Sequence, residues 1–279
     1  MIREFDLDVG DGHTLHAYDT GPADARLTVL WHHGTPNIGT PPEPLFPLSQ
    51  RLGIRWVGYD RPGYGGSTRQ AGRTVGSAAR LAAVVADHLG VERFATAGHS
   101  GGGPHALACG ALLGDRVLAV ACGSGPAPYG AEGLDYFAGM TSSGEASSRA
   151  AMAGVAAKEK YEAGAEFDPD SFTDGDNQAL RGEWSWMLRV VVPAMESDDG
   201  GLVDDDIAYV SPWGFDPAEV TAPLLLVHGE DDRMVPVGHG RWLAEHCRGA
   251  RLRTYPGEGH VSVLKHAESM VEWLADAAA

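Results

Sequence analysis

The sequence predicts an α/β fold built on a mostly parallel sheet, and three observations support this. Short apolar, β-branched runs alternate with amphipathic helical patterns along most of the chain, which is typical of a sheet covered by helices on both faces. Several of these runs end in glycine-containing loops. With 279 residues, 43% of them hydrophobic, the chain can bury one large core or two modest ones.

The expected strands begin with an antiparallel hairpin, because residues 2–8 and 13–19 flank the turn Gly10-Asp11-Gly12. Further strands are expected at residues 27–31, 54–59, 94–97, 117–121, 224–227 and 251–255. Helices are expected at 77–89 and 263–275, where apolar residues recur on one face.

The alternation stops between about residues 130 and 215, where helical patterns and scattered aromatic residues replace strands. The strand–helix series resumes at Ala222. Ligands of parallel sheets bind at the carboxyl edge of the strands, and an insertion at that edge would cover them. We therefore expect a core of residues 1–129 and 216–279 and a helical lid of residues 130–215.

Composition limits the classes of partner. A net charge of −17 repels phosphate backbones, so nucleic acid is not expected as a partner, and neutral or cationic small molecules suit this charge better. No stretch has the roughly 18 apolar residues of a membrane span. The first residues mix charges and lack the apolar region of a signal peptide, so a cytoplasmic protein is expected. Nothing in the sequence indicates an oligomeric state.

Three cysteines, Cys109, Cys122 and Cys247, show no metal-ligand spacing. We expect them to be reduced and mainly buried.

Residues 98–102, Gly-His-Ser-Gly-Gly, follow an expected strand and precede an expected helix. The pattern G-x-S-x-G in this context forms a sharp turn that presents the serine above the sheet, with a helix N-terminus behind it. Ser100 is therefore the candidate nucleophile, and a purely structural turn serine is the alternative.

A serine hydroxyl needs a base to remove its proton. His260 lies in a glycine-flanked loop after the last expected strand, which gives the chain order serine, acid, histidine. We expect His228, His239 and His266 to be polar or satisfied surface residues. The acid should follow a late strand, and the loop after residues 224–227 offers Glu230, Asp231 and Asp232. Spacing alone does not choose among these three.

Three further segments complete a resemblance to the α/β-hydrolase superfamily, in its lidded, lipase-like and epoxide-hydrolase-like branch. Residues 33–36 (HGTP) look like its H-G-x-P segment, and residues 60–67 (DRPGYGGS) look like its D-x-P-G-x-G-x-S loop. Residues 229–236 (GEDDRMVP) are similar to its G-x-x-D-x-x-V-P segment, which implies that Asp232 is the acid. The matches run from about residue 27 to the end and leave only the lid uncovered.

The resemblance implies an α/β-hydrolase fold with a mostly parallel eight-stranded sheet and an oxyanion hole made by the backbone N–H groups of Thr35 and Gly101. Thr35 departs from the aromatic residue frequent in epoxide hydrolases, and its hydroxyl could contact the substrate or only satisfy the loop. Epoxide hydrolases and haloalkane dehalogenases use an aspartate nucleophile, so Ser100 argues against both activities. The 60–67 loop is expected to be structural.

Two sets of lid residues have alternative interpretations. The aromatic residues either line a substrate pocket or form the lid's own core: Tyr136, Trp184 and Trp186. The acidic residues do not fit a calcium loop and are expected to form a solvated face or loop, with an anchor for a cationic group or a metal site as the alternatives: Asp198, Asp199, Asp204, Asp205 and Asp206.

The expected function is hydrolysis of small-to-medium carboxylic esters by a serine hydrolase, with no cofactor or metal implied. Relatives with the same triad imply alternatives: a prolyl aminopeptidase, a C–C bond hydrolase, or a cofactor-free haloperoxidase that makes peracids. The acidic lid is consistent with the aminopeptidase alternative, because such an enzyme needs carboxylates to bind the amine of its substrate. A non-catalytic small-molecule receptor on the same fold is the alternative from another class.

Overall fold

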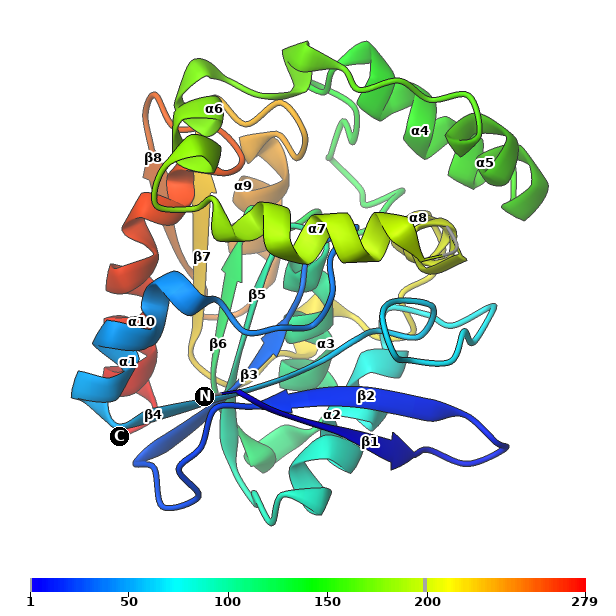
Figure 1. Ribbon diagram of the computed structural model, residues 1–279. Coiled ribbons are helices and arrows are strands. Elements are labelled where there is room, and N and C mark those ends of the chain that lie inside the picture. Colours follow the sequence, from blue (N-terminus) through cyan, green and yellow to red (C-terminus); the bar gives the residue numbers. More distant parts are fainter. Residues whose placement is uncertain (1, 198–199) are drawn as a thin grey trace.

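An eight-stranded sheet forms the centre of the computed structural model, which describes residues 2–197 and 200–279 (Figure 1). The strands are β1 (Arg3–Asp8), β2 (Thr14–Asp19), β3 (Leu27–His32), β4 (Ile54–Tyr59), β5 (Phe94–His99), β6 (Val117–Gly123), β7 (Leu224–Gly229) and β8 (Arg251–Tyr255). Their order is β1-β2-β4-β3-β5-β6-β7-β8. β2 is antiparallel to β1 and β4, and all other pairings are parallel. The expected fold class is confirmed.

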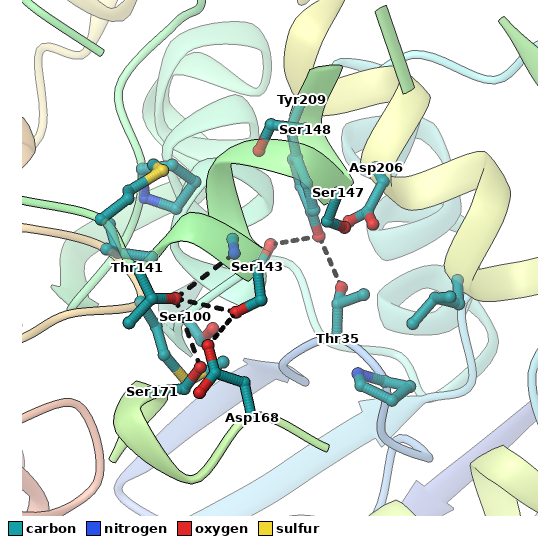
Figure 2. Close-up of a pocket in the computed structure, with 18 of the residues that line it drawn as sticks. Thr35, Ser100, Thr141, Ser143, Ser147, Ser148, Asp168, Ser171, Asp206 and Tyr209 are labelled. Atoms are coloured by element: carbon teal, nitrogen blue, oxygen red, sulfur yellow. Dashed lines mark hydrogen bonds between the residues drawn. The ribbon is translucent and has the colours of Figure 1, made fainter. Parts of the chain in front are cut away.

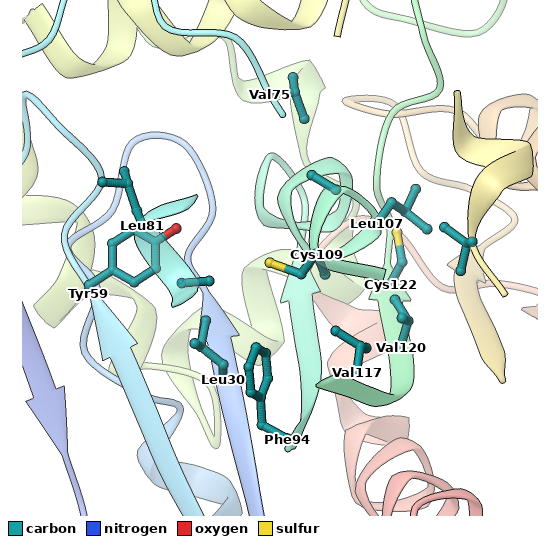
Figure 3. Close-up of a cluster of buried hydrophobic side chains, with 14 of the residues drawn as sticks. Leu30, Tyr59, Val75, Leu81, Phe94, Leu107, Cys109, Val117, Val120 and Cys122 are labelled. Atoms are coloured by element: carbon teal, nitrogen blue, oxygen red, sulfur yellow. The ribbon is translucent and has the colours of Figure 1, made fainter. Parts of the chain in front are cut away.

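Helices cover both faces of the sheet. Residues of α2 (Ser77–His88), α3 (Gly102–Leu112) and α9 (Val237–His246) join one core cluster, part of which is shown in Figure 3. Residues of α1 (Phe46–Leu52) and α10 (Ala267–Ala277) join the other. Neighbouring strand residues point to opposite faces, so Leu30 belongs to the first cluster and Val29 and Trp31 to the second. The helix expected at 263–275 starts with a 3₁₀ turn, η5 (Ser262–His266), and continues as α10.

Among the described residues, five α-helices separate β6 from β7: α4 (Ser142–Met152), α5 (Val155–Glu162), α6 (Asp174–Arg181), α7 (Trp186–Glu196) and α8 (Gly200–Val210). We call residues 142–210 the helical segment. Figure 1 shows these helices gathered over the end of the sheet toward which β6 and β7 point. The remaining short 3₁₀ helices are η1 (Glu43–Leu45), η2 (Gly114–Arg116), η3 (Pro169–Ser171) and η4 (Pro217–Glu219).

The expected solvated acidic face is wrong for α8. Asp204 is 4% exposed and binds Arg69 through two hydrogen bonds of 2.9 Å. Asp205 is fully buried and pairs with Arg61 and Arg73, each at 2.6 Å. The arginines come from more than 130 residues earlier in the chain, so local spacing could not reveal these pairs. Asp198 and Asp199 lie outside the described residues.

All three cysteines are free and buried, as expected. Among the described residues, no helix has both the length and the apolar character that crossing a membrane requires.

Candidate active site

Ser100 occupies a sharp turn between β5 and α3. Its φ is +55°, in the left-handed region that non-glycine residues seldom adopt. Its N–H donates to the carbonyl of Gly123 at 2.8 Å, which anchors the turn to β6. A Cβ at Gly98 would lie 2.2 Å from the carbonyl oxygen of Gly102, and a Cβ at Gly102 would lie 1.9 Å from that of His32. Only glycine fits at these two positions, and the resulting turn has the geometry of a nucleophile elbow.

Two backbone N–H groups are free beside the serine. Among the described residues, the N–H groups of Thr35 and Gly101 donate to no protein acceptor. The segment containing Thr35 lies against the elbow, because a Cβ at Gly34 would be 3.5 Å from the Cβ of Ser100. The α3 helix begins just after Gly101 and directs the positive end of its dipole at the same place. Such donors can stabilise an oxyanion.

Asp232 and His260 form a buried hydrogen-bonded pair. The Oδ2 atom of Asp232 accepts from Nδ1 of His260 at 2.8 Å, while its Oδ1 accepts the N–H groups of Met234 and Val235 at 3.0 and 2.9 Å. Of the other two candidate acids, Asp231 is exposed and Glu230 accepts from Thr254. Within the described chain, the carboxylate that contacts His260 is therefore that of Asp232.

The charges of this pair support each other. Burial raises the pKa of Asp232, but the charge and hydrogen bond of His260 outweigh it, and the net pKa lies below its usual range. Burial lowers the pKa of His260, but Asp232 outweighs it and holds the net pKa above 6.5. The carboxylate is thus suited to orient the imidazole and to stabilise its protonated form.

His99 connects this pair to the elbow. Its Nε2 donates to the carbonyl of His260 at 2.9 Å, and the two rings lie 4.9 Å apart. Burial lowers the pKa of His99 to about 3, so it remains a neutral donor. In the described chain, the Oγ of Ser100 and the Nε2 of His260 are not hydrogen-bonded to each other. Hydrogen bonds between catalytic groups are often long before substrate binds.

His228 and His239 are buried, which corrects their expected surface position. Nε2 of His228 donates to the carbonyl of Val235 at 2.7 Å and lies 3.6 Å from Oδ2 of Asp232. Nε2 of His239 donates to the carbonyl of Tyr136, and its Nδ1 accepts from a backbone N–H. Burial lowers the pKa of both histidines, to about 4 for His239. Each is therefore a neutral ring that forms hydrogen bonds with backbone groups of nearby loops.

A pocket of about 330 Å³ opens at Ser100 between the elbow and the helical segment (Figure 2). Besides Thr35 and Ser100, its lining includes five serine and threonine side chains, those of Thr141, Ser143, Ser147, Ser148 and Ser171. It also includes four carboxylates, those of Glu162, Glu166, Asp168 and Asp206. None of the described lining residues is a lysine or arginine.

A buried lysine, Lys158, contacts two of these lining carboxylates. The ammonium group of Lys158 is fully buried and contacts Glu162 and Asp206, each at 2.5 Å. Burial raises the pKa of Asp206, and Lys158 only partly offsets this effect. One lysine neutralises at most one of the four carboxylates, so the pocket is acidic.

Of the two alternatives for the aromatic residues, pocket lining describes Tyr136 but not the two tryptophans. Tyr136 lines the pocket. Trp184 and Trp186 are each 3% exposed, pack edge to face at 6.4 Å, and belong to the core cluster that contains Val261. Trp186 begins α7, and Trp184 lies two residues before it. The carbonyl of Val190 in α7 accepts the N–H of Ile38 from the core. That docking buries the indoles against the core instead of exposing them to substrate.

A buried network that sequence reasoning missed holds the loop containing Thr35. The guanidinium of Arg61 donates to the carbonyls of His33 and Gly34 and, at 3.0 Å, to the hydroxyl of Thr35. That hydroxyl donates to Asp205 at 2.6 Å. The side chain of Thr35 therefore satisfies the loop, and the 60–67 segment has the structural role expected of it.

Tyr209 of α8 joins the same network to the elbow. Its hydroxyl donates to the carbonyl of Gly101 at 3.0 Å and lies 2.8 Å from the hydroxyl of Thr35. The helical segment thus contacts both loops that supply the free N–H groups.

Comparisons with known proteins agree with this fold. Residues 28–267 match the family model of the alpha/beta hydrolase fold. The chain is 28% identical to a 2-hydroxy-6-oxononadienedioate/2-hydroxy-6-oxononatrienedioate hydrolase from Cupriavidus pinatubonensis, over 96% of this chain and 92% of that protein. It is 27% identical to a bifunctional esterase/perhydrolase from Acinetobacter calcoaceticus, over 93% and 94% of the two chains.

Solved structures show the same fold. A thermophilic esterase from Thermogutta terrifontis superposes with a TM-score of 0.73 at 19% identity, over 99% of this chain and all of that one. An enol-lactonase from Burkholderia xenovorans gives a TM-score of 0.69 at 20% identity, over 97% and 98% of the two chains. This protein belongs to the α/β-hydrolase-fold family of enzymes.

Proposed function

We propose that this hydrolase cleaves small-to-medium carboxylic esters through an acyl-enzyme on Ser100. The observation that carries the proposal is the arrangement at one end of the sheet. A strained elbow serine and the two residues with free backbone N–H groups line one pocket. The Asp232–His260 pair is buried behind it, and Met234 and Val235, whose N–H groups donate to Asp232, line the same pocket. These are the parts that acyl transfer requires.

In the proposed reaction, the Oγ of Ser100 attacks the ester carbonyl while Nε2 of His260 takes its proton. The N–H groups of Thr35 and Gly101 stabilise the oxyanion, and loss of one such donor typically costs about 10²–10³ in kcat. His260 then gives the proton to the departing alcohol. Water, deprotonated by His260, attacks the acyl-enzyme, and His260 returns that proton to the Oγ of Ser100 as the acid leaves. Asp232 orients His260 throughout.

The pocket supports a restricted substrate class. Its volume of about 330 Å³ is at the small end of ligand pockets, which span roughly 300–1,000 Å³. Its four carboxylates repel an acyl chain that ends in a carboxylate, so neutral or cationic esters are favoured. The relative from Cupriavidus pinatubonensis is named for a dienedioate, which carries two carboxylates. C–C bond cleavage of such a compound therefore fits this pocket less well than ester hydrolysis does.

The acidic lining also favours one second candidate, a peptidase that binds a substrate amine. Its reaction would use the same acyl-enzyme with an amine as the leaving group. For either substrate class, the helical segment would act as the lid that covers the pocket. We propose a cytoplasmic location for the protein.

A substrate panel tests the proposal. Nitrophenyl esters with matched acyl chains ending in methyl, trimethylammonium or carboxylate would be compared with a proline anilide and a ring-fission dienedioate, using Ser100→Ala as the blank. We expect ester turnover above the blank, with kcat/KM for the methyl and trimethylammonium esters about 10-fold or more above that for the carboxylate ester. Cleavage of the dienedioate or the anilide without ester hydrolysis would overturn the proposal.

A further inference from the structure

A buried carboxylate of the helical segment contacts the loop that carries His260. Asp176 lies in the first turn of α6 and is 1% exposed. Its Oδ1 accepts the N–H groups of Val261 and Ser262, each at 2.7 Å. Val261 directly follows His260, so a residue of the helical segment holds the backbone next to the candidate base.

The two oxygens of Asp176 have separate tasks. Its Oδ2 accepts the N–H and the hydroxyl of Thr173, each at 2.9 Å, and completes a capping box at the start of α6. Capping the helix therefore needs only Oδ2, while Oδ1 is left for the His260 loop. A helix cap alone does not account for the two contacts across more than 80 residues of chain.

The carboxylate also lies against the backbone that precedes His260. A Cβ at Gly259 would be 2.1 Å from Oδ2 of Asp176. The N–H of Gly259 donates to the hydroxyl of Ser262 at 2.7 Å, and the carbonyl of His260 accepts from His99. The backbone on both sides of His260 is thus held in place, with Asp176 contacting both.

Asp176 is ionised at neutral pH. Burial raises its pKa, but hydrogen bonds from Ser262, Thr173 and Val261 outweigh burial and hold the net pKa below its usual range. The groups that act on His260 are the carboxylates of Asp232 and Asp176, with the neutral rings of His99 and His228 nearby. The second carboxylate raises the pKa of His260 in addition to Asp232.

We propose that Asp176 is a positioning residue for His260, supplied by the helical segment and acting through the backbone of Val261 and Ser262. This rests on the proposed function, in which His260 is the base. The helical segment then has a second task besides covering the pocket, because it supports the loop on which the base is carried.

Two variants separate the charge of Asp176 from its contacts. Asp176→Asn keeps one oxygen that can accept the two N–H groups of the His260 loop, but it removes the charge and replaces the oxygen that faces Thr173 by an NH₂ group. Asp176→Ala removes the charge and all of these contacts. Asp174→Asn is the matched control, since Asp174 is an exposed aspartate in the same turn of α6. The readouts are the NMR titration of the His260 ring, assigned by its loss in His260→Gln, the pH profile of ester hydrolysis, and the melting temperature.

We expect His260 to titrate at lower pH in Asp176→Asn, with the acid limb of kcat/KM moving in the same direction. We expect Asp176→Ala also to lose about 10- to 100-fold in kcat at the pH plateau, as small misplacements of catalytic groups do. Asp174→Asn should match the wild type in all three readouts.

An unchanged His260 titration in Asp176→Asn, together with an unchanged plateau kcat in Asp176→Ala, would overturn the proposal even if melting temperatures fell. The titration needs no substrate, so it decides the role of Asp176 separately from the ester panel. Failure of the wild type to hydrolyse any ester would instead refute the proposed function.

Discussion

Replacing Asp205 by asparagine is expected to destabilise the protein strongly. The substitution keeps the shape of the side chain but removes a negative charge that is fully buried. Arg61 and Arg73, whose side chains are 2% and 4% exposed, would lose their ion-pair partner. Burial raises the pKa of Asp205, but these arginines outweigh it and hold the pKa well below its usual range, so the charge is present at neutral pH.

The size of the effect follows from the burial. Removing one partner of a buried ion pair costs about 3–5 kcal/mol, because an uncompensated charge stays in the interior. The free energy of unfolding of most proteins is only about 5–15 kcal/mol. Each kcal/mol shifts the melting temperature by about 2–4 °C in domains of 150–250 residues. The melting temperature should therefore fall by roughly 6–20 °C.

A surface ion pair provides the control. Glu145→Gln removes the pair with Arg149 in α4, whose side chains are 40% and 58% exposed. Exposed helical pairs of this kind contribute about 0.3–0.5 kcal/mol. Calorimetry and urea titration of both variants measure the difference. Equal stability of Asp205→Asn and Glu145→Gln would refute the reasoning that Asp205 holds a buried network together.

The other predictions concern the site and its surroundings. Asp232→Asn should lower kcat by about 10⁴, a magnitude taken from the same substitution of the chymotrypsin-type aspartate. Asp231→Asn should change kcat little. If steady-state kinetics ranked the two variants in reverse, Asp231 would be the acid. The value of kcat/KM should fall as the pH decreases through the pKa of His260, which lies above 6.5. Histidine ordinarily titrates within about pH 5 to 8, so a flat profile over this range would exclude a histidine base. Trp186→Ala should lower the free energy of unfolding by about 3–5 kcal/mol and reduce the hydrolysis of short and long esters alike, because the indole is buried in the core. A selective loss of activity on long esters, measured on the folded variant, would instead indicate that Trp186 lines the pocket.

The strands and the elbow were predictable because their signals are local. Each expected strand appears in the structure with its ends shifted by at most two residues. Gly98 and Gly102 adjoin Ser100 in sequence, so the residues that make the turn possible can be read together. The location of His260 and the elbow at the same edge followed from the parallel sheet, in which the loops after all parallel strands open at one edge.

The parts that could not be predicted depend on distant contacts. Asp205 occurs in a run of acids that resembles a solvated face, and its partner Arg61 is 144 residues away. The capping box of Thr173 and Asp176 is a local contact, but the second contact of Asp176, with the His260 loop, joins residues 85 positions apart. The burial of Trp184 and Trp186 depends on how α7 docks, which aromatic spacing does not reveal.

Trapping the acyl-enzyme tests the central claim most directly. A nitrophenyl ester would be mixed with the protein, quenched in acid within the first turnover, and the protein analysed by peptide mass spectrometry. The mechanism requires the acyl mass on the peptide that contains Ser100, and its loss together with ester turnover in Ser100→Ala. An acyl group on another residue, or wild-type turnover in Ser100→Ala, would contradict the account.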